Sequence, residues 1–349
     1  MPDTTFKAGF DQLASGIGQL IRGNGQVVRL ALVCLFAEGH LLIEGPPGVA
    51  KTSLAKAIAQ SVTGAGHKRI QFTPDLLPSD VTGSRVYRQG AEPEFEPGPV
   101  FTNILIADEI NRASPRTQSA LLEVMGERQV TVDGETRAVP APFLCVATQN
   151  PADHRGTFPL PEAQIDRFMM KVTMTTPDRA AEMDVLTGAL SRRALPGEIP
   201  PGRRLSLGQV QAMISAVRDV RVDDSVKGYL LDIVAATRTG PAGPGSRRGQ
   251  RQPPEVVTGV STRATLALAL AAQAHAASAG RAYAAPDDVK AVAVPVLAHR
   301  LVLSEAAADR GVTAAAVIAR LLDRLPVPSP EQAARATWQA GDTPAARVG

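Results

Sequence analysis

The residues GPPGVAKT (45–52) follow directly on the short apolar run HLLIEG (40–45). A short apolar run that ends in glycine is typical of a buried strand in a parallel sheet. The residues from Lys51 onward favour a helix, so the glycine- and proline-rich turn lies between a predicted strand and a predicted helix. The backbone N–H groups of such a turn, together with the helix N-terminus, form a binding site for phosphate groups.

The residue types of this turn predict a nucleotide-binding loop. Lys51 is expected to reach the β- and γ-phosphates of a nucleotide, and the hydroxyl of Thr52 is a candidate ligand of Mg²⁺. Ala50 stands where the widest form of the motif has glycine, so the loop must tolerate a Cβ near the phosphates. The predicted nucleotide-binding residues are Gly45, Pro46, Pro47, Gly48, Val49, Ala50, Lys51, Thr52, Ser53 and, from a second motif, Asp108.

Two further apolar runs extend the pattern outward from the loop. FTNILIADE (101–109) and APFLCVATQN (141–150) both end in polar residues, and helical patterns separate the three runs. Strands that alternate with helices predict an α/β fold with a parallel sheet. Residues 83–99 and 129–139 depart from the alternation, and the Asp-Gly pair within QVTVDGETRAV is a strong hairpin signal. We expect both segments to be β-hairpin inserts.

Two consecutive carboxylates follow the apolar run ILIA (104–107). The carboxyl ends of strands are where α/β sheets bind ligands, so Asp108 is expected to hold Mg²⁺ through water beside the phosphate loop. Glu109 is expected to act as the general base that polarises the water attacking the γ-phosphate. A solvated strand end is the alternative interpretation for such a pair alone, but the phosphate loop in the same predicted sheet favours the catalytic one.

Beyond about residue 176 the composition changes to alanine-rich amphipathic helices. The sequence therefore predicts a nucleotide-binding α/β domain over residues 1–176 and an all-α domain over 177–327. Residues 239–259 are rich in glycine, proline and arginine, a composition that predicts a mobile loop. Residues 328–349 are expected to form a C-terminal tail.

Composition narrows the class of protein further. Of the 349 residues, 44% are hydrophobic and 20% are charged, as in ordinary globular proteins. We find no apolar run of the roughly 20 residues that a membrane span needs and no secretory signal pattern, so we expect a cytoplasmic protein without direct membrane insertion. The net charge is only +3 and aromatic residues make up 4% of the chain, so no nucleic-acid partner is expected.

Longer stretches closely resemble the MoxR group of AAA+ ATPases, relatives of the magnesium-chelatase ATPase subunits. The resemblance covers roughly residues 20–300 and rests on the phosphate loop together with three further segments. These are QFTPDLLPSDVTG (71–83), GPVFTNILIADEINRASPRTQSALLEVM (98–125) and ATQNPADHRGTFPLPEAQIDRFMM (147–170). The resemblance implies a P-loop AAA+ core followed by a small all-α lid.

The same resemblance implies roles for three more residues. Asn150 matches the sensor 1 position, where its amide would orient the attacking water; an asparagine that caps the core is the alternative. Arg167 matches the arginine finger, which reaches the γ-phosphate bound by the neighbouring subunit; an ion pair with Asp166 or Glu162 is the alternative. Arg263 matches sensor 2 in the lid, although Thr262 replaces the usual preceding proline.

The implied activity is Mg²⁺-dependent ATP hydrolysis to ADP and phosphate. Proteins of this group form homo-oligomeric rings, most often hexamers, and act like chaperones on a protein client, often with a von Willebrand factor A-domain partner. Two alternatives stay open from the sequence: a DNA-acting AAA+ motor or activator, and a nucleotide-gated scaffold without turnover. The intact Glu109 argues against the scaffold.

Overall fold

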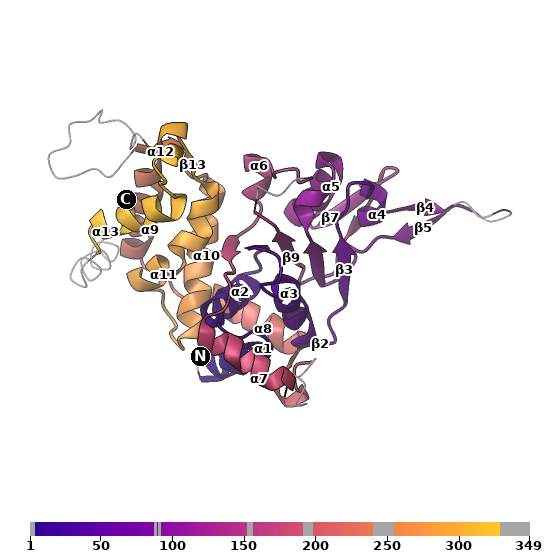
Figure 1. The fold of residues 1–349 in the computed structure, drawn as a ribbon, viewed down its shortest axis with the longest axis horizontal. Coiled ribbons are helices and arrows are strands. Elements are labelled where there is room, and N and C mark those ends of the chain that lie inside the picture. The colour runs from indigo at the N-terminus through magenta and orange to yellow at the C-terminus, as the bar shows by residue number, and fades with distance from the viewer. Residues whose placement is uncertain are drawn as a thin grey trace, which may run out of the picture. The chain divides into compact units, whose positions relative to one another are not determined.

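The computed structural model describes residues 4–86, 89, 92–151, 156–190, 198–239 and 255–328. The chain divides into two compact units, one spanning Thr4–Val217 and the other beginning at Arg218. Figure 1 shows the first unit in indigo to pink and the second in orange to yellow. Across the described part of the chain, none of the helices combines the length and the apolar character that crossing a bilayer requires.

The first unit is built on a five-stranded parallel sheet with the strand order β10-β1-β9-β6-β3. The three strands predicted from apolar runs occupy its centre, which confirms the expected α/β class. Their residues are almost entirely buried, as a sheet covered on both faces requires. The strands are β1 (Leu41–Glu44), β3 (His67–Gln71), β6 (Ile104–Asp108), β9 (Leu144–Gln149) and β10 (Met170–Thr173).

The helices of this unit bury apolar faces: α2 (Gly25–Phe36) and α3 (Lys51–Gln60) contact strands of the sheet, and α1 (Thr4–Leu20) contacts these two helices. In α1, Phe6, Phe10, Leu13 and Ile17 recur at helical spacing and are buried. In α5, Ser114 caps the N-terminus by accepting a hydrogen bond from the N–H of Thr117. The helices of this unit are α1 (Thr4–Leu20), α2 (Gly25–Phe36), α3 (Lys51–Gln60), α4 (Pro78–Thr82), α5 (Pro115–Glu127), α6 (Glu162–Ile165), α7 (Arg179–Leu190) and α8 (Leu207–Arg218).

Both expected hairpins are present. β4 (Gly83–Val86) pairs antiparallel with β5 (Glu94–Pro97), and β7 (Gln129–Val132) pairs antiparallel with β8 (Glu135–Ala138). Asp133 and Gly134 form the turn of the second hairpin with φ angles of 51° and 79°. Both residues therefore have the left-handed backbone that an Asp-Gly turn supplies at low cost.

The boundary between the two compact units lies after Val217, whereas the composition changes near residue 176. Residues 177–217, which the sequence places in the helical domain, belong to the unit that carries the sheet. Two contacts account for this: β11 (Leu205–Ser206) pairs in parallel with β2 (Val62–Thr63), and the side-chain amide of Gln12 donates a hydrogen bond to the carbonyl of Arg204. Helical composition alone did not indicate which unit these residues join.

The second unit is mainly helical. This agrees with the expected small helical lid, and the unit also contains one short antiparallel pair of strands, of three and two residues. Most of the expected 239–259 loop, residues 240–254, and the tail from residue 329 lie outside the described residues. The elements are α9 (Asp224–Thr239), β12 (Val256–Thr258), α10 (Thr262–Ser278), α11 (Pro286–Leu297), β13 (Val302–Leu303), α12 (Glu305–Asp309) and α13 (Ala314–Arg324).

Candidate functional site

The predicted phosphate loop connects the carboxyl end of β1 to the first residue of α3. Ala50 caps α3 with φ 66° and ψ 28°, and Gly48 also has a positive φ of 87°. The loop therefore turns through left-handed backbone even where alanine replaces glycine. Gly45 has a different reason to be glycine, because a Cβ there would meet the carbonyl oxygen of Met174. The tight turn leaves the N-terminus of α3 at the edge of the sheet.

Lys51 is the first residue of α3 and is only 8% exposed. Its ammonium group donates hydrogen bonds to the carbonyl oxygens of Gly45 and Pro46 and, over 2.9 Å, to Oδ1 of Asn150. Burial lowers the pKa of Lys51, and the negative charges of Glu109, Asp108 and Glu44 oppose that shift. The lysine is thus held at the sheet edge by the loop it belongs to.

Asp108 is the last residue of β6, and its side chain is 5% exposed. The hydroxyl of Thr52 lies 2.9 and 3.0 Å from its two oxygens, and Thr148 donates to Oδ1 over 2.6 Å. Nη2 of Arg69 lies 2.7 Å from Oδ2. Burial raises the pKa of Asp108, but the hydrogen bonds from Thr148, Arg69 and Thr52 outweigh burial, so the pKa is lowered.

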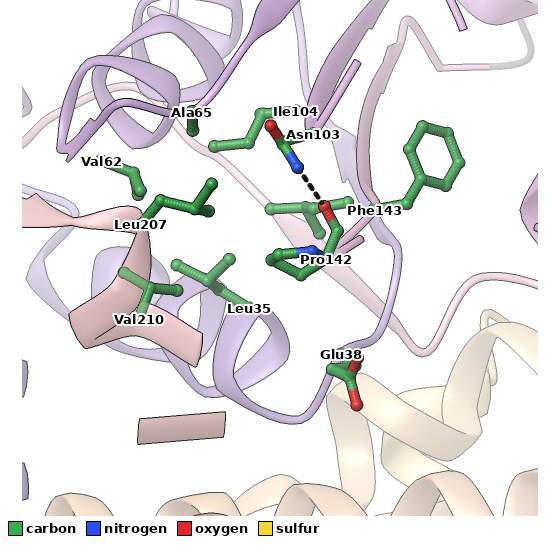
Figure 2. A pocket seen from close by; sticks show the side chains of 11 residues that line it. Leu35, Glu38, Val62, Ala65, Asn103, Ile104, Pro142, Phe143, Leu207 and Val210 are labelled. Atoms are coloured by element: carbon green, nitrogen blue, oxygen red, sulfur yellow. Dashed lines mark hydrogen bonds between the residues drawn. The ribbon is translucent and has the colours of Figure 1, made fainter. Parts of the chain in front are cut away.

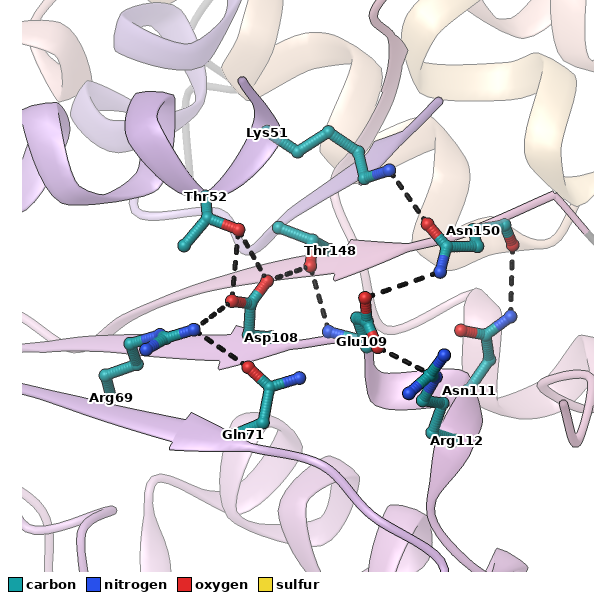
Figure 3. A network of polar contacts seen from close by, with 10 residues as sticks. All are labelled: Lys51, Thr52, Arg69, Gln71, Asp108, Glu109, Asn111, Arg112, Thr148 and Asn150. Carbon is teal, nitrogen blue, oxygen red and sulfur yellow. Dashed lines mark hydrogen bonds and ion pairs between the residues drawn. The ribbon is translucent and has the colours of Figure 1, made fainter. Parts of the chain in front are cut away.

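Glu109 directly follows β6 and has the left-handed backbone angles φ 54° and ψ 50°. Its N–H donates to the Thr148 hydroxyl over 2.9 Å, which fixes the residue at the end of the strand. Oε1 lies 3.5 Å from Nδ2 of Asn150, and Oε2 lies 2.8 Å from Nε of Arg112. Figure 3 shows the Glu109 carboxylate between Asn150 and Asp108.

Asn150 connects the two halves of the site. Its amide oxygen accepts from Lys51 and its amide nitrogen faces Glu109. Its backbone carbonyl accepts a hydrogen bond of 3.0 Å from the side chain of Asn111. Because β9 lies between β1 and β6 in the sheet, the residue after β9 lies between the loop and the carboxylates. The structure therefore brings together Lys51, Thr52, Asp108, Glu109 and Asn150, as the sequence predicts.

The residues around Asp108 fit a Mg²⁺ ion. Mg²⁺ prefers hard oxygen ligands, keeps several waters, and is held by one or two carboxylates together with substrate phosphates. The hydroxyl of Thr52 and the carboxylate of Asp108 face each other at the end of the phosphate loop and supply that kind of donor. Within the described ranges, no cluster of three or more His, Cys, Asp or Glu side chains forms a protein-only metal site.

The described hydrogen bonds and ion pairs of this network do not include the other two predicted arginines. Arg167 is half-buried, and its guanidinium donates to the carbonyl of Leu122 on α5 and lies beside Gly126. Arg263 is in the first turn of α10 in the second unit, after the cap residue Ser261. The roles of both arginines remain predictions.

The sequence reasoning missed several residues of the network, among them Arg112, Thr148 and Arg69. Arg112 comes three residues after Glu109, and Thr148 lies in β9 two residues before Asn150, which directly follows that strand. Strand alternation places Thr148 and Asn150 on one face, so this signal could have identified the threonine. Arg69 lies on β3, whose polar sequence HKRIQ gives no apolar run by which to recognise the strand.

A small apolar pocket lies away from this network, at the amino ends of β6 and β9 (Figure 2). The amide of Asn103 donates to the carbonyl of Pro142 at its wall over 3.1 Å. The pocket and the carboxylates are at opposite ends of the same strands, so the pocket is not part of the candidate site. Its lining residues are Leu35, Glu38, Val62, Ala65, Asn103, Ile104, Pro142, Phe143, Leu144, Leu207 and Val210.

Comparisons with known proteins identify the family of the chain. Residues 40–170 match the AAA_3 model, the ATPase family associated with various cellular activities, and residues 248–321 match the AAA lid domain. The chain is 44% identical to the protein YeaC of Bacillus subtilis, with 91% of this chain and 95% of YeaC covered. It is 42% identical to the chaperone MoxR1 of Mycobacterium tuberculosis, with coverages of 89% and 80%.

A solved structure extends the comparison to the fold. A crystal structure of a candidate ATPase from Cytophaga hutchinsonii superposes with a TM-score of 0.81 at 35% sequence identity. The match covers 93% of this chain and 96% of that one, so the same arrangement of sheet and helices spans nearly the full length of both proteins.

Proposed function

Because the chain belongs to the MoxR-type AAA ATPases, we propose that it binds ATP with Mg²⁺ and hydrolyses it to ADP and phosphate. The observation that carries this proposal is the connected network at the carboxyl edge of the sheet. There Asn150 joins the phosphate-loop lysine, Lys51, to Glu109, while Thr52 contacts Asp108. These contacts support the proposal because they group a lysine, a carboxylate that could hold metal and a candidate base at one edge of the sheet.

Each side chain has a distinct part in the proposed reaction. Lys51 neutralises the β- and γ-phosphates once its present carbonyl partners are exchanged for phosphate oxygens. Glu109 accepts a proton from the attacking water, and Asn150 orients that water between itself and the carboxylate. Thr52 and Asp108 would hold Mg²⁺, which stabilises the charge that develops on the phosphate oxygens when it is bound.

The complete site is proposed to need a second subunit and the lid. Arg167 would complete the site of a neighbouring copy in a ring, most often a hexamer in this group, and Arg263 would contact the nucleotide of its own chain. An arginine finger suits this task because guanidinium stays charged and matches phosphate oxygens in shape. We further propose that the ring remodels or assembles a protein client together with a von Willebrand factor A-domain protein, and that the two hairpins contact the client.

Two substitutions test the proposed ATPase activity. Lys51→Ala should abolish ATP binding, whereas Glu109→Gln should leave binding intact and reduce phosphate release by roughly 10²- to 10⁴-fold. Binding is measured with a fluorescent ATP analogue, and turnover by steady-state phosphate release. Lys56→Ala, an exposed position on α3, and Glu123→Gln, an exposed position on α5, are the matched controls. Full turnover by the Glu109→Gln variant would contradict the assignment of the base.

The client is sought with the same variant. Glu109→Gln is expected to hold the ATP-bound state, so a protein client should copurify with it in the presence of ATP. The same preparation in ADP, and Lys51→Ala in ATP, should release that protein. Equal recovery under all three conditions would contradict a nucleotide-controlled client site.

A further inference from the structure

The carboxylate of Asp108 has a charged partner that the proposed reaction does not use. Nη2 of Arg69 lies 2.7 Å from Oδ2, and the same nitrogen donates to the side-chain oxygen of Gln71 over 2.8 Å. Figure 3 shows the guanidinium reaching Asp108 from the neighbouring strand β3, on the opposite side from Lys51. Arg69 is therefore positioned by two acceptors on two strands.

The burial of the two partners is unequal. The side chain of Asp108 is 5% exposed, whereas that of Arg69 is 44% exposed on the outermost strand of the sheet. A carboxylate removed from water is costly without a nearby positive charge. Arg69 supplies that charge at a smaller desolvation cost, because its side chain is far more exposed than that of Asp108.

Every oxygen of Asp108 is occupied by a partner from the protein. Oδ1 accepts from Thr52 and Thr148, and Oδ2 accepts from Thr52 and Arg69. A threonine hydroxyl can turn and offer its own oxygen to a metal ion, so Thr52 can change from hydrogen-bond donor to metal ligand while its side chain stays beside Asp108. A guanidinium has no acceptor and cannot become a ligand, so Arg69 and a cation compete for the same carboxylate.

We propose that Arg69 is the resident counter-charge of Asp108 and that it sets the metal requirement of the site, because Mg²⁺ binds only as the guanidinium withdraws from the carboxylate. The inference rests on the proposed function, since it takes Asp108 as the residue that holds Mg²⁺. Arg69 lies on an exposed edge strand, so its side chain can withdraw into solvent. Metal-free protein keeps a neutralised carboxylate, and the site becomes competent for catalysis only when metal replaces arginine.

The test measures how strongly Mg²⁺ promotes nucleotide binding. The dissociation constant of a fluorescent ADP analogue is determined in excess EDTA and in saturating Mg²⁺, and the ratio of the two constants reports the metal's contribution. Removing the competitor in R69Q should raise this ratio by roughly 3- to 10-fold, the range expected for a half-exposed charged hydrogen bond. R69K keeps the charge and should stay within about twofold of the unchanged protein.

K68Q is the matched control, because it removes the same charge from the same strand. Successive side chains of a strand point to opposite faces, so Lys68 is directed away from the face that carries Arg69 and Gln71. Its ratio should equal that of the unchanged protein. An unchanged or lowered ratio in R69Q overturns the proposal, because Arg69 would then not compete with the metal. An equal rise in K68Q also overturns it, because any positive charge on the strand would then have the same electrostatic effect.

A second measurement does not depend on nucleotide. Without metal, R69Q should unfold at a lower temperature than the unchanged protein, and Mg²⁺ alone should raise its unfolding temperature more than that of the unchanged protein. Equal responses of the two proteins to Mg²⁺ overturn the proposal. If the unchanged protein binds no nucleotide in either condition, the proposed ATPase function fails, and the thermal measurement still decides whether Arg69 competes with a cation at Asp108.

Discussion

Two residues of the site have left-handed backbone although neither is glycine. Ala50 has φ 66° at the start of α3, and Glu109 has φ 54° at the end of β6. This conformation costs a non-glycine residue roughly 1–2 kcal/mol. Both residues lie where a strand or loop must turn sharply to present a group to the phosphates. Among the described residues, Glu38, Arg128 and Asp133 have the same backbone conformation outside the site, so two of the five such non-glycine residues lie at the turns on which the proposed chemistry depends.

Thr148 is predicted to position the base. Its hydroxyl accepts from the N–H of Glu109 and donates to Asp108, and the residue is fully buried. Thr148→Val keeps the shape but leaves the Glu109 N–H without this acceptor, so the free energy of unfolding should fall by about 1–3 kcal/mol. Turnover should fall roughly 10- to 100-fold because the carboxylate of Glu109 is displaced, and nucleotide affinity should change less.

Thr148→Ser retains the hydroxyl and serves as the control for that substitution. Urea denaturation gives the free energy of unfolding, and phosphate release gives kcat and KM. If the valine and serine variants have the same kcat, the hydroxyl does not position Glu109.

The residues that the sequence predicts and those that it misses differ in how they are connected. Lys51, Thr52, Asp108 and Glu109 belong to short motifs next to recognisable apolar strands. Arg69 acts through a partner on another strand, 39 residues away in the chain. Such a contact depends on strand order and register, which are properties of the assembled sheet, so no local pattern indicates it.

Among the elements, the buried central strands were predictable and the edges of the sheet were not. β1, β6 and β9 are apolar because they are covered on both faces. The edge strand β3 is mostly exposed and buries only Ile70, so its sequence resembles a polar loop. Edge strands carry charged side chains that discourage pairing with other chains, and the same property hides them from hydrophobic periodicity.

The two hairpin inserts are joined to each other by side chains. Arg85 on β4 lies 2.7 Å from the carboxylate of Glu135 and 3.4 Å from that of Asp133, both on the second hairpin. The guanidinium of Arg137 on β8 lies 4.2 Å from the ring centre of Phe95 on β5. The Asp-Gly pair predicted the second hairpin locally, but the contact between the two hairpins is tertiary and no local pattern indicates it.

The helices α10 and α11 are joined by a buried carboxylate, and this predicts how stability depends on pH. Asp288 is fully buried; burial raises its pKa, but hydrogen bonds from His275, Arg281 and the N–H of Ala285 lower it to about 2. A depressed pKa adds stability above the unfolded value of 3.8 that is lost as the pH falls towards 2. Asp288→Asn should therefore cost about 2 kcal/mol at neutral pH.

Urea denaturation between pH 3 and pH 7 checks this expectation. The difference between the unchanged protein and Asp288→Asn should be constant near neutral pH and should shrink below about pH 4. Asp287→Asn, at the exposed neighbouring position, should leave stability nearly unchanged at every pH. A difference that is independent of pH would show that the charge of Asp288 does not stabilise the helices.

At the scale of the whole molecule, the first unit contains the loop lysine, both carboxylates and Asn150, and it also contains Arg167. That arginine contacts α5 of its own chain through the carbonyl of Leu122. The loop lysine, the two carboxylates and Asn150 belong to one contact network. Within the described part of the chain, Arg167 forms no hydrogen bond with any of these four residues. This separation is what a residue that serves a neighbouring copy would show, and it motivates a test in mixed assemblies.

Two inactive variants are predicted to complement each other. Arg167→Ala should bind ATP but turn it over roughly 10³- to 10⁵-fold more slowly, because no finger arginine reaches its phosphates. Lys51→Ala should bind no ATP but still carries Arg167. When the two are mixed and assembled, a Lys51→Ala subunit should complete the site of an Arg167→Ala neighbour and restore phosphate release. The double variant Lys51→Ala/Arg167→Ala should restore nothing in the same mixture, and full activity of Arg167→Ala alone would show that each chain hydrolyses ATP without its neighbour.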